Sequence, residues 1–325
     1  MRVALTGVAH WHTPFYLDPL LDLPNTEIVG VADPSPMSAQ RVAAQAGCAA
    51  FRDTAELCDS THPDVVFALG RHCDMAATAQ ALIARRIPFA LEKPCGLAAA
   101  QVRDIALKAK QGGVFAAVPF VFRYSEPLRA IQDTGDPVVY ASFKFVAGEV
   151  GRYRETGNDW MLSRATAGGG CTLNLGVHFL DFARALFGPS LTVTGATMSN
   201  ALAGLDVEDH GTVLLERCLV ETGYFYPAPT STFDMHFSVR TANHHFAARD
   251  ADTLEVVDAR TGHSQLLSMP TTNVPYYPAF TRDVLRRVEH GLPPLSSLDD
   301  MAAVFDLVEQ AYALSPFAGA QSPHA

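Results

Sequence analysis

The chain begins with the stretch Arg2-Val3-Ala4-Leu5-Thr6-Gly7-Val8-Ala9-His10-Trp11-His12, in which an apolar run ends at a glycine. Further apolar runs follow within the first 120 residues, at 27–32, 64–69, 87–91 and 114–118. Helical patterns stand between them, at 36–47, 74–86 and 97–111. Continuous apolar strands that alternate with helices are typical of a parallel sheet covered on both faces. Residues 1–120 are therefore predicted to form a doubly wound α/β domain.

The pattern changes after residue 120. Strand-like stretches follow with little helix between them, at 140–146, 191–199, 211–226, 234–248 and 253–257. Two helical patterns close the chain, at 278–290 and 298–314. This arrangement predicts an α+β domain with a mainly antiparallel sheet over residues 121–315. Residues 316–325 are rich in Pro, Ala and Ser and are expected to form a flexible tail.

Composition limits the possible functions. The 325 residues are 48% hydrophobic and 18% charged, which excludes global disorder, and the net charge of −10 argues against nucleic acid or an anionic membrane as partner. Residues 1–120 hold 10 basic and 11 acidic side chains and residues 121–325 hold 14 and 23, so the first domain is the better host for an anionic ligand. No apolar run is long enough for a membrane span. The six cysteines lie far apart without a CxxC pair, which favours reduced thiols and a cytoplasmic location.

Ligands of an open parallel sheet bind beyond the carboxyl ends of its strands. The loops expected there carry candidate cofactor-binding residues: Gly7, Ala9, His10, Trp11, His12, Asp33, Gly70, Arg71, Glu92 and Lys93. Of the three glycines in a G-x-G-x-x-G dinucleotide fingerprint only the first is present, and the other two positions hold Ala9 and His12. Thr13-Pro14 is typical of an N-cap followed by a first helical proline, so the helix is expected to start late.

Two of these positions have alternative interpretations. Asp33 ends the second apolar run, where an acidic residue binds a ribose diol and repels a 2′-phosphate, which favours NAD over NADP; it is equally suited to capping a turn. Arg71 is suited to clamping a phosphate or to lying in solvent.

A metal site is a further alternative at the same end of the sheet. His10, His12, His72 and Cys73 all fall on its loops, and two histidines in one loop with a third ligand can bind zinc or nickel. The histidines are equally suited to packing on a cofactor, and we predict no metal.

Two motifs extend this interpretation. Glu92-Lys93-Pro94 follows a predicted strand, and far downstream comes the stretch GGGCTLNLGVHFLD, residues 168–181. In this order they resemble the marks of the Gfo/Idh/MocA group, the glucose–fructose oxidoreductase and inositol dehydrogenase family. Arg123-Tyr124, Trp160 and the pattern at 296–300 also look like family positions.

The resemblance implies a Rossmann domain followed by an α+β domain whose open sheet supports homodimers or homotetramers. It implies hydride transfer between NAD(P) and a sugar-like or cyclitol alcohol or ketone. Lys93 matches the family lysine that contacts the reacting oxygen and the cofactor ribose, and His178 matches the acid/base histidine. Asn174 stands where the family usually has Asp; it can orient a neighbour but cannot hold a negative charge. The substrate side is expected to include Arg123, Trp160, Arg164 and Asp181.

This chemistry agrees with the residue types. Oxidation of an alcohol needs a base near the hydroxyl proton and a cation for the developing alkoxide, for which His178 and Lys93 are suited. Asn174, His178 and Asp181 are spaced i, i+4 and i+7 and are expected on one helix face, which is otherwise simply the polar side of a helix. A catalytically silent nucleotide- or sugar-sensing regulator and an NAD-using glycoside hydrolase on the same scaffold remain alternatives. The sequence does not identify the polyol or sugar substrate.

Overall fold

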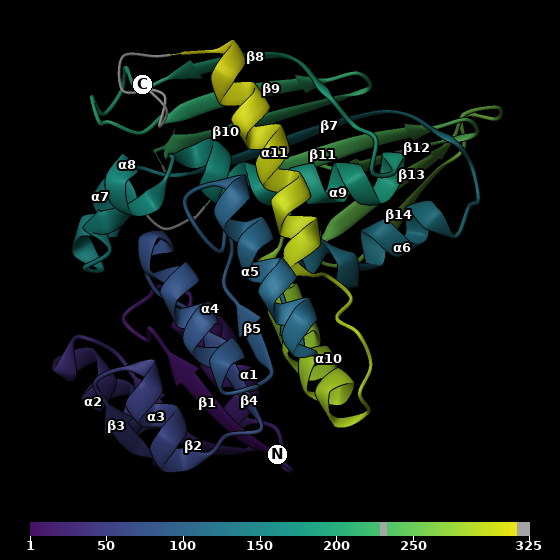
Figure 1. The fold of residues 1–325 in the computed structure, drawn as a ribbon. Helices are drawn as coiled ribbons and strands as arrows, with labels where there is room; N and C mark the ends of the chain where they lie inside the picture. Colours follow the sequence, from purple (N-terminus) through teal and green to yellow (C-terminus); the bar gives the residue numbers. More distant parts are fainter. Residues whose placement is uncertain (228–232, 317–325) are drawn as a thin grey trace.

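A computed structural model describes residues 1–227 and 233–316 and contains two sheets, each with its own helices (Figure 1). The first sheet has six strands in the order β3-β2-β1-β4-β5-β6, and every pair is parallel. The predicted doubly wound sheet is therefore confirmed. Its strands are β1 (Arg2–Thr6), β2 (Glu27–Ala32), β3 (Ala49–Phe51), β4 (Val65–Ala68), β5 (Phe89–Leu91) and β6 (Ala116–Ala117).

Helices cover both faces of this sheet, because alternate strand residues point to opposite sides. Val3, Leu5 and Phe67 pack with the helices of one face, whereas Ala4 and Val66 belong to the core on the other. The first face is covered by α1 (Thr13–Leu21), α2 (Pro36–Ala46) and α10 (Tyr277–Glu289). The second is covered by α3 (Thr54–Thr61), α4 (Met75–Ala84) and α5 (Ala99–Gly112).

Local signals explain where these helices begin and end. The Ser35 hydroxyl accepts a hydrogen bond from the Ser38 amide at the start of α2, and Gly47 closes that helix in the left-handed region at φ 68°. Helix α1 does start late, but Thr13 is not its N-cap as the sequence suggested. His12 holds that position without a side-chain cap, and Thr13 Oγ1 donates to the Val8 carbonyl oxygen at 3.0 Å.

The second sheet has eight strands in the open order β14-β13-β12-β11-β7-β10-β9-β8. It is antiparallel except for the parallel pair β7–β10, so the predicted mainly antiparallel sheet is confirmed. The stretches 211–226 and 234–248 each prove to be a hairpin. The strands are β7 (Val138–Gly148), β8 (Val193–Ser199), β9 (His210–Leu215), β10 (Cys218–Tyr226), β11 (Phe233–Thr241), β12 (His244–Ala248), β13 (Thr253–Asp258) and β14 (Ser264–Ser268).

One face of this sheet packs on α9 (Val177–Phe187). Phe179 of that helix stacks on Phe143 of β7 with ring centroids 4.8 Å apart, and Phe182 lies 5.4 Å from Phe237 of β11. Buried aromatic pairs at these distances stabilise the contact beyond the area they bury. The other helices of this half are α6 (Glu126–Gln132), α7 (Gly151–Glu155), α8 (Arg164–Ala167) and α11 (Leu298–Leu314).

The end of the described chain returns to the first sheet, as Figure 1 shows for the yellow-green α10 and the yellow α11. Tyr277 and Phe280 of α10 share a core with Tyr16 of α1. The Glu309 carboxylate of α11 accepts a hydrogen bond from the Ala99 amide at 2.8 Å, which fixes α11 at the start of α5. The last nine residues of the predicted tail, 317–325, lie outside the described residues.

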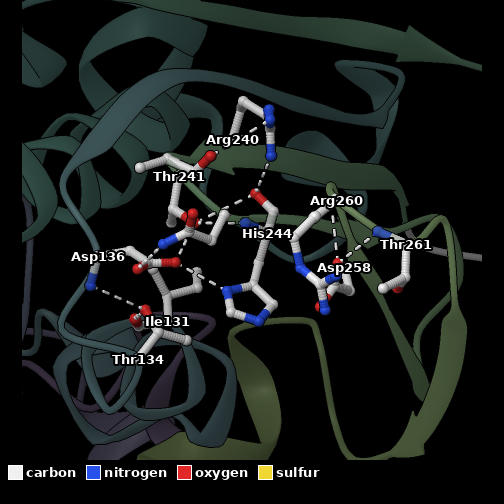
Figure 2. Close-up of polar contacts among 11 residues, drawn as sticks. Ile131, Thr134, Asp136, Arg240, Thr241, His244, Asp258, Arg260 and Thr261 are labelled. Carbon is white, nitrogen blue, oxygen red and sulfur yellow. Dashed lines mark hydrogen bonds and ion pairs between the residues drawn. The ribbon is translucent and has the colours of Figure 1, made fainter.

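The hairpin β11–β12 is tied to the loop that follows α6, as Figure 2 shows. The Asp136 carboxylate accepts hydrogen bonds from Asn243 Nδ2 at 2.7 Å, His244 Nδ1 at 2.8 Å and Thr241 Oγ1 at 3.0 Å.

All six cysteines are free thiols. In the described part of the chain, no helix has both the length and the apolar character needed to cross a membrane.

Candidate active site

The loop after β1 depends on the glycine that the sequence retains. Gly7 lies in the left-handed region at φ +72°, and a Cβ atom there would overlap the carbonyl oxygen of Leu69, beside the end of β4. The Gly7 amide donates to the Ala32 carbonyl oxygen at 2.8 Å. Gly7 therefore makes the tight turn that the first glycine of a dinucleotide fingerprint provides.

Asp33, at the end of β2, holds this loop in place. Its carboxylate is buried and accepts hydrogen bonds from the Ala9 amide at 2.7 Å and the Ser35 amide at 2.8 Å. The turn-capping role is therefore present in the structure. The remaining lone pairs of the two oxygens can still accept from a ribose diol.

The residues that replace the later glycines form an aromatic cluster. The His10 ring lies 5.7 Å from Trp160, Trp11 lies 5.7 Å from Tyr153, and His10 and His12 are both buried. Burial lowers the pKa of His10 and of His12 well below the ordinary value. Both imidazoles are therefore neutral at physiological pH.

The loop after β4 carries Gly70, Arg71 and His72 to different places. Arg71 points to the surface, where its Nε donates to Asp74 at 2.7 Å, so it does not join the cluster. His72 is buried: its Nδ1 lies 2.7 Å from the Ala167 carbonyl oxygen and its ring 4.9 Å from Trp160. Burial lowers the pKa of His72 to about 3.

These histidines do not gather into a group of potential metal ligands within the described residues. Across residues 1–227 and 233–316, no group of three or more His, Cys, Asp or Glu side chains has the geometry to hold a metal ion. The metal alternative at His10, His12, His72 and Cys73 gains no support from the structure.

Lys93 follows β5 and is buried. Its Nζ donates to both the backbone oxygen and Oδ1 of Asn174, each at 2.8 Å. Burial lowers the pKa of Lys93 to about 8. The neighbouring Glu92 carboxylate accepts from the Tyr16 hydroxyl and from the Lys93 amide, and His12 Nδ1 lies 3.3 Å away from it. Glu92 thus links the loop after β5 to α1 and to His12 of the loop after β1.

Asn174 is positioned by the glycines before it. A Cβ atom on Gly170 would overlap the backbone of Glu208, and the buried Glu208 carboxylate accepts from the Gly170 amide at 2.8 Å and the Thr172 amide at 2.9 Å. Asn174 lies in a π-helical turn, Thr172–Gly176, and not in the α-helix that the spacing suggested. This extra-wide turn is a recurrent feature of functional sites. No local sequence signal pointed to Glu208.

His178 lies on the first turn of α9 and is 2% exposed. Its Nδ1 is buried and has no hydrogen-bond partner among the described residues. Burial and the charge of Lys93 lower the pKa of His178 well below its usual range. His178 is therefore a neutral imidazole with a nitrogen available to a ligand.

The Asn174 amide also organises residues that the sequence did not single out. Its Nδ2 donates to the Tyr153 hydroxyl at 2.9 Å and to the Tyr224 hydroxyl at 3.0 Å. Arg152 Nη2 donates to the same Tyr153 hydroxyl at 2.7 Å. These side chains come from α7 and β10, and no periodicity or spacing links them in the sequence.

The predicted substrate-side residues separate into two groups. Trp160 joins the cluster, where its Nε1 donates to Asn158 Oδ1 at 3.1 Å. Arg123 and buried Asp181 instead pair with each other at 2.6 Å. The Arg164 guanidinium lies 5.6 Å over the Tyr312 ring. Only Trp160 of the four is thus part of the cluster around the glycine loop.

The cluster fits a nicotinamide dinucleotide. Gly7 follows β1 and Asp33 follows β2, at the turn and strand end where a dinucleotide binds. Buried Lys93 follows β5, which is separated from β1 by β4 in the sheet. Trp11 Nε1 and His178 Nδ1 are buried without hydrogen-bond partners among the described residues. Unpaired buried polar groups cost free energy unless a ligand or water satisfies them.

Comparison with known proteins finds a family model that matches a segment in each half of the chain. Residues 1–120 match the GFO_IDH_MocA model, an oxidoreductase family with an NAD-binding Rossmann fold, and residues 141–217 match the model of the GFO/IDH/MocA C-terminal domain. No curated protein matches the chain.

Solved structures share the fold over nearly the whole chain. GenD2 from gentamicin A biosynthesis, in complex with NAD, is 22% identical with a TM-score of 0.82 and covers 96% of this chain and 93% of its own. An oxidoreductase from Agrobacterium radiobacter, in complex with NAD+, L-tartaric acid and magnesium, is 18% identical with a TM-score of 0.84 over 96% and 95%. Levoglucosan dehydrogenase, in complex with NADH and levoglucosan, is 16% identical with a TM-score of 0.85 over 97% and 98%.

Proposed function

Because the chain belongs to the GFO/IDH/MocA oxidoreductase family, we propose that it transfers a hydride between NAD(P) and a sugar-like or cyclitol alcohol or its ketone. The observation that carries this proposal is the buried pair of Lys93 and Asn174, together with His178, whose pKa the Lys93 charge lowers and whose Nδ1 has no hydrogen-bond partner among the described residues. It supplies a cation and a base at the ligand edge of the first sheet, which are the two groups that alcohol oxidation needs.

Lys93 is proposed to stabilise the reacting oxygen. A bound NAD(P) supplies or accepts the hydride. With its pKa at about 8, the Lys93 amine is mainly protonated at neutral pH and donates to the oxygen as negative charge develops on it. Burial strengthens this interaction because water does not compete for the ammonium.

His178 is proposed to take the hydroxyl proton. Its lowered pKa keeps the imidazole neutral, so that one ring nitrogen can accept the proton. Asn174 is proposed to orient Lys93: its Oδ1 accepts from Nζ, while its Nδ2 is fixed by Tyr153 and Tyr224. An amide in this place aligns the ammonium without adding the negative charge of an aspartate.

The cofactor residues follow from the same geometry. Gly7, Ala9, His10, Trp11 and His12 would line the dinucleotide together with Gly70 and Glu92, and Arg71 would do so only if it left Asp74. Asp33 would bind the ribose diol, and its carboxylate disfavours a 2′-phosphate, so we propose NAD over NADP. Similar structures include complexes with NAD and with NADP.

The substrate class is proposed from the family and its structures. Levoglucosan dehydrogenase and a putative myo-inositol dehydrogenase share the fold, which supports a sugar or polyol as substrate. We further propose that the protein is cytoplasmic, that residues 1–120 and 121–315 form its two domains, and that the eight-stranded sheet joins subunits in a homodimer or homotetramer. Arg123, Arg164 and Asp181 would support the substrate domain from outside the cluster.

Energy transfer from tryptophan to nicotinamide tests the proposal. The chain has two tryptophans, Trp11 and Trp160, and both lie in the cluster. Titration with NADH or NADPH should therefore quench tryptophan emission and sensitise nicotinamide emission. No binding of either cofactor up to millimolar concentration would overturn the proposal and favour the silent sensing regulator. Once binding is shown, a panel of polyols and sugars is assayed for turnover, which is measured as the change in nicotinamide absorbance.

A further inference from the structure

Arg152 lies at the junction between the glycine loop and the Asn174 network. Its guanidinium carbon is 4.6 Å from the centre of the Tyr153 ring, 5.5 Å from that of Trp11 and 5.8 Å from that of Tyr224. One of these rings belongs to the loop after β1, and the other two belong to the second half of the chain. The positive charge is therefore held where the cofactor and substrate sides of the site meet.

The hydrogen bonds of Arg152 are incomplete. Nη2 donates to the Tyr153 hydroxyl at 2.7 Å, whereas Nε is buried without an acceptor. Among the residues that the structure describes, no carboxylate forms an ion pair with Arg152. Arg123 differs, because it pairs with Asp181 at 2.6 Å and with Asp300 at 2.9 Å. Contacts with aromatic faces offset part of the cost of a half-buried guanidinium but leave the Nε donor unsatisfied.

A chain of hydrogen bonds connects Arg152 to the proposed reaction centre. The Tyr153 hydroxyl accepts from Arg152 Nη2 and from Asn174 Nδ2, and Asn174 Oδ1 accepts from Lys93 Nζ. The charge of Arg152 also contributes to the lowered pKa of Lys93 and of His12. Arg152 and Lys93 are therefore close enough to interact electrostatically.

Glu92 precedes Lys93 in the chain, and its charge raises the pKa of Lys93, opposite to the effect of Arg152. Glu92 accepts from the Tyr16 hydroxyl and from the Lys93 amide and forms no ion pair with Arg152 in the described part of the chain. The positive charges of Lys93 and Arg152 are matched in number by the carboxylates of Glu92 and Asp33, and Asp33 accepts from the Ala9 and Ser35 amides, so neither carboxylate is paired with Arg152. An arginine with no carboxylate partner among the described residues and a buried Nε without an acceptor favours an anionic ligand.

We propose that Arg152 is a specificity residue that binds the carboxylate of an acidic substrate, so that the substrates are sugar-derived hydroxy acids and not neutral polyols. Nε and Nη2 lie along one edge of the guanidinium, and such an edge matches the two oxygens of a carboxylate. The inference rests on the proposed function, since it names the substrate class of the same site.

Paired ligands test this assignment on the protein saturated with NAD+. Tryptophan emission is titrated with D-gluconate, D-galactonate, D-glucuronate and D-galacturonate, and with the neutral counterparts D-glucitol, galactitol, D-glucose and D-galactose. At least one acid should bind at least about tenfold more tightly than its neutral counterpart, as the loss of a charge-assisted hydrogen bond implies. D-Glucose 6-phosphate is titrated as a second kind of anion.

Variants then assign the effect to this side chain. Arg152→Met keeps an unbranched chain against the rings and should weaken binding of the acid about tenfold or more, with the neutral counterpart unchanged. Arg152→Lys should recover part of the loss. Arg154→Met removes an exposed charge two residues away on α7 and should change neither ligand. Circular dichroism verifies that each variant is folded.

The outcomes separate the two proposals. Equal binding of acids and neutral counterparts, or an Arg152→Met variant that binds the acid normally, overturns the inference. Binding of the sugar phosphate alone overturns the carboxylate assignment. If the nucleotides do not bind, the proposed hydride transfer fails, and the same ligands are titrated on the cofactor-free protein. An acid that then binds more tightly than its neutral counterpart, and loses this advantage in Arg152→Met, still supports the inference.

Discussion

The Lys93 ammonium donates to two atoms of Asn174, the backbone oxygen and Oδ1, each at 2.8 Å. One residue follows a strand of the first sheet and the other lies in the π-helical turn before α9. The contact therefore joins the two halves of the chain through a charged group whose burial lowers its pKa to about 8.

Replacement of Lys93 should separate activity from stability. The folded protein binds the Lys93 proton less tightly than the unfolded chain, so at neutral pH the buried ammonium opposes folding. Lys93→Met should abolish turnover and raise the free energy of unfolding by up to about 3 kcal/mol, the equivalent of a pKa lowered from 10.5 to about 8. Turnover assays and urea denaturation measure the two effects. Exposed Lys108→Met is the control, and unchanged turnover in Lys93→Met would remove Lys93 from the mechanism.

The pH dependence of turnover should report the same group. Below pH 8 Lys93 is protonated and can hold an alkoxide, whereas above it the neutral amine cannot, so kcat should fall on the alkaline side with a midpoint near 8. Asn174→Asp places a negative charge beside Nζ and should move this midpoint upward by about one unit or more. The exposed Asn25→Asp variant should leave the profile unchanged. A midpoint that Asn174→Asp does not move would contradict the assignment.

The two glycines Gly7 and Gly47 form a matched pair for testing the turn after β1. Both have positive φ, +72° and +68°, but a Cβ atom would overlap the Leu69 carbonyl oxygen only at Gly7 and meets no atom within 4 Å at Gly47. Gly47→Ala should therefore cost about 1 kcal/mol from its left-handed backbone, and Gly7→Ala at least about 3 kcal/mol. Denaturation by urea compares them, and equal losses would show that the close approach is unimportant.

The Asp136–His244 contact in Figure 2 should make stability depend on acid pH. Hydrogen bonds from His244 and Asn243 lower the pKa of Asp136, so its contribution is present above the ordinary carboxyl pKa and is lost as pH falls through the lowered value. Asp136→Asn should thus lower Tm at pH 7, and the difference from the unchanged protein should disappear in acid, once pH falls below the lowered pKa of Asp136. Asp18→Asn, on the exposed side of α1, is the control. A Tm difference that persists in acid would contradict this role.

The fold could be predicted because its signals are local. Buried parallel strands are continuous apolar runs, and Gly47 marks a helix end by its own conformational freedom. Strand β3 and helix α3, which lie between α2 and β4, were not predicted. Strand β3 has only three residues, which is too few to show a period. The hairpin turns inside 211–226 and 234–248 were missed because both strands of each pair are equally apolar in pattern.

The site could be predicted only where a motif carried it. Lys93 and His178 stand in recognisable stretches, whereas Arg152, Tyr153 and Tyr224 reach Asn174 through contacts between distant parts of the chain. The sequence could not show which charged residues face a ligand and which pair with each other inside the protein. Asp181 has the same spacing as a catalytic partner, but the structure places it against Arg123.

The return of α10 and α11 to the first sheet affects any attempt to recombine this protein with its relatives. Phe280 and Val284 complete the apolar face that Leu5 and Leu17 present, and Glu309 holds the Ala99 amide at the start of α5. A chimera that exchanged everything after residue 120 would replace the side chains that cover that face with those of the relative, and the close packing between them would be lost. The transplantable unit is instead the internal stretch that contains the second sheet, grafted so that the recipient keeps its own two closing helices.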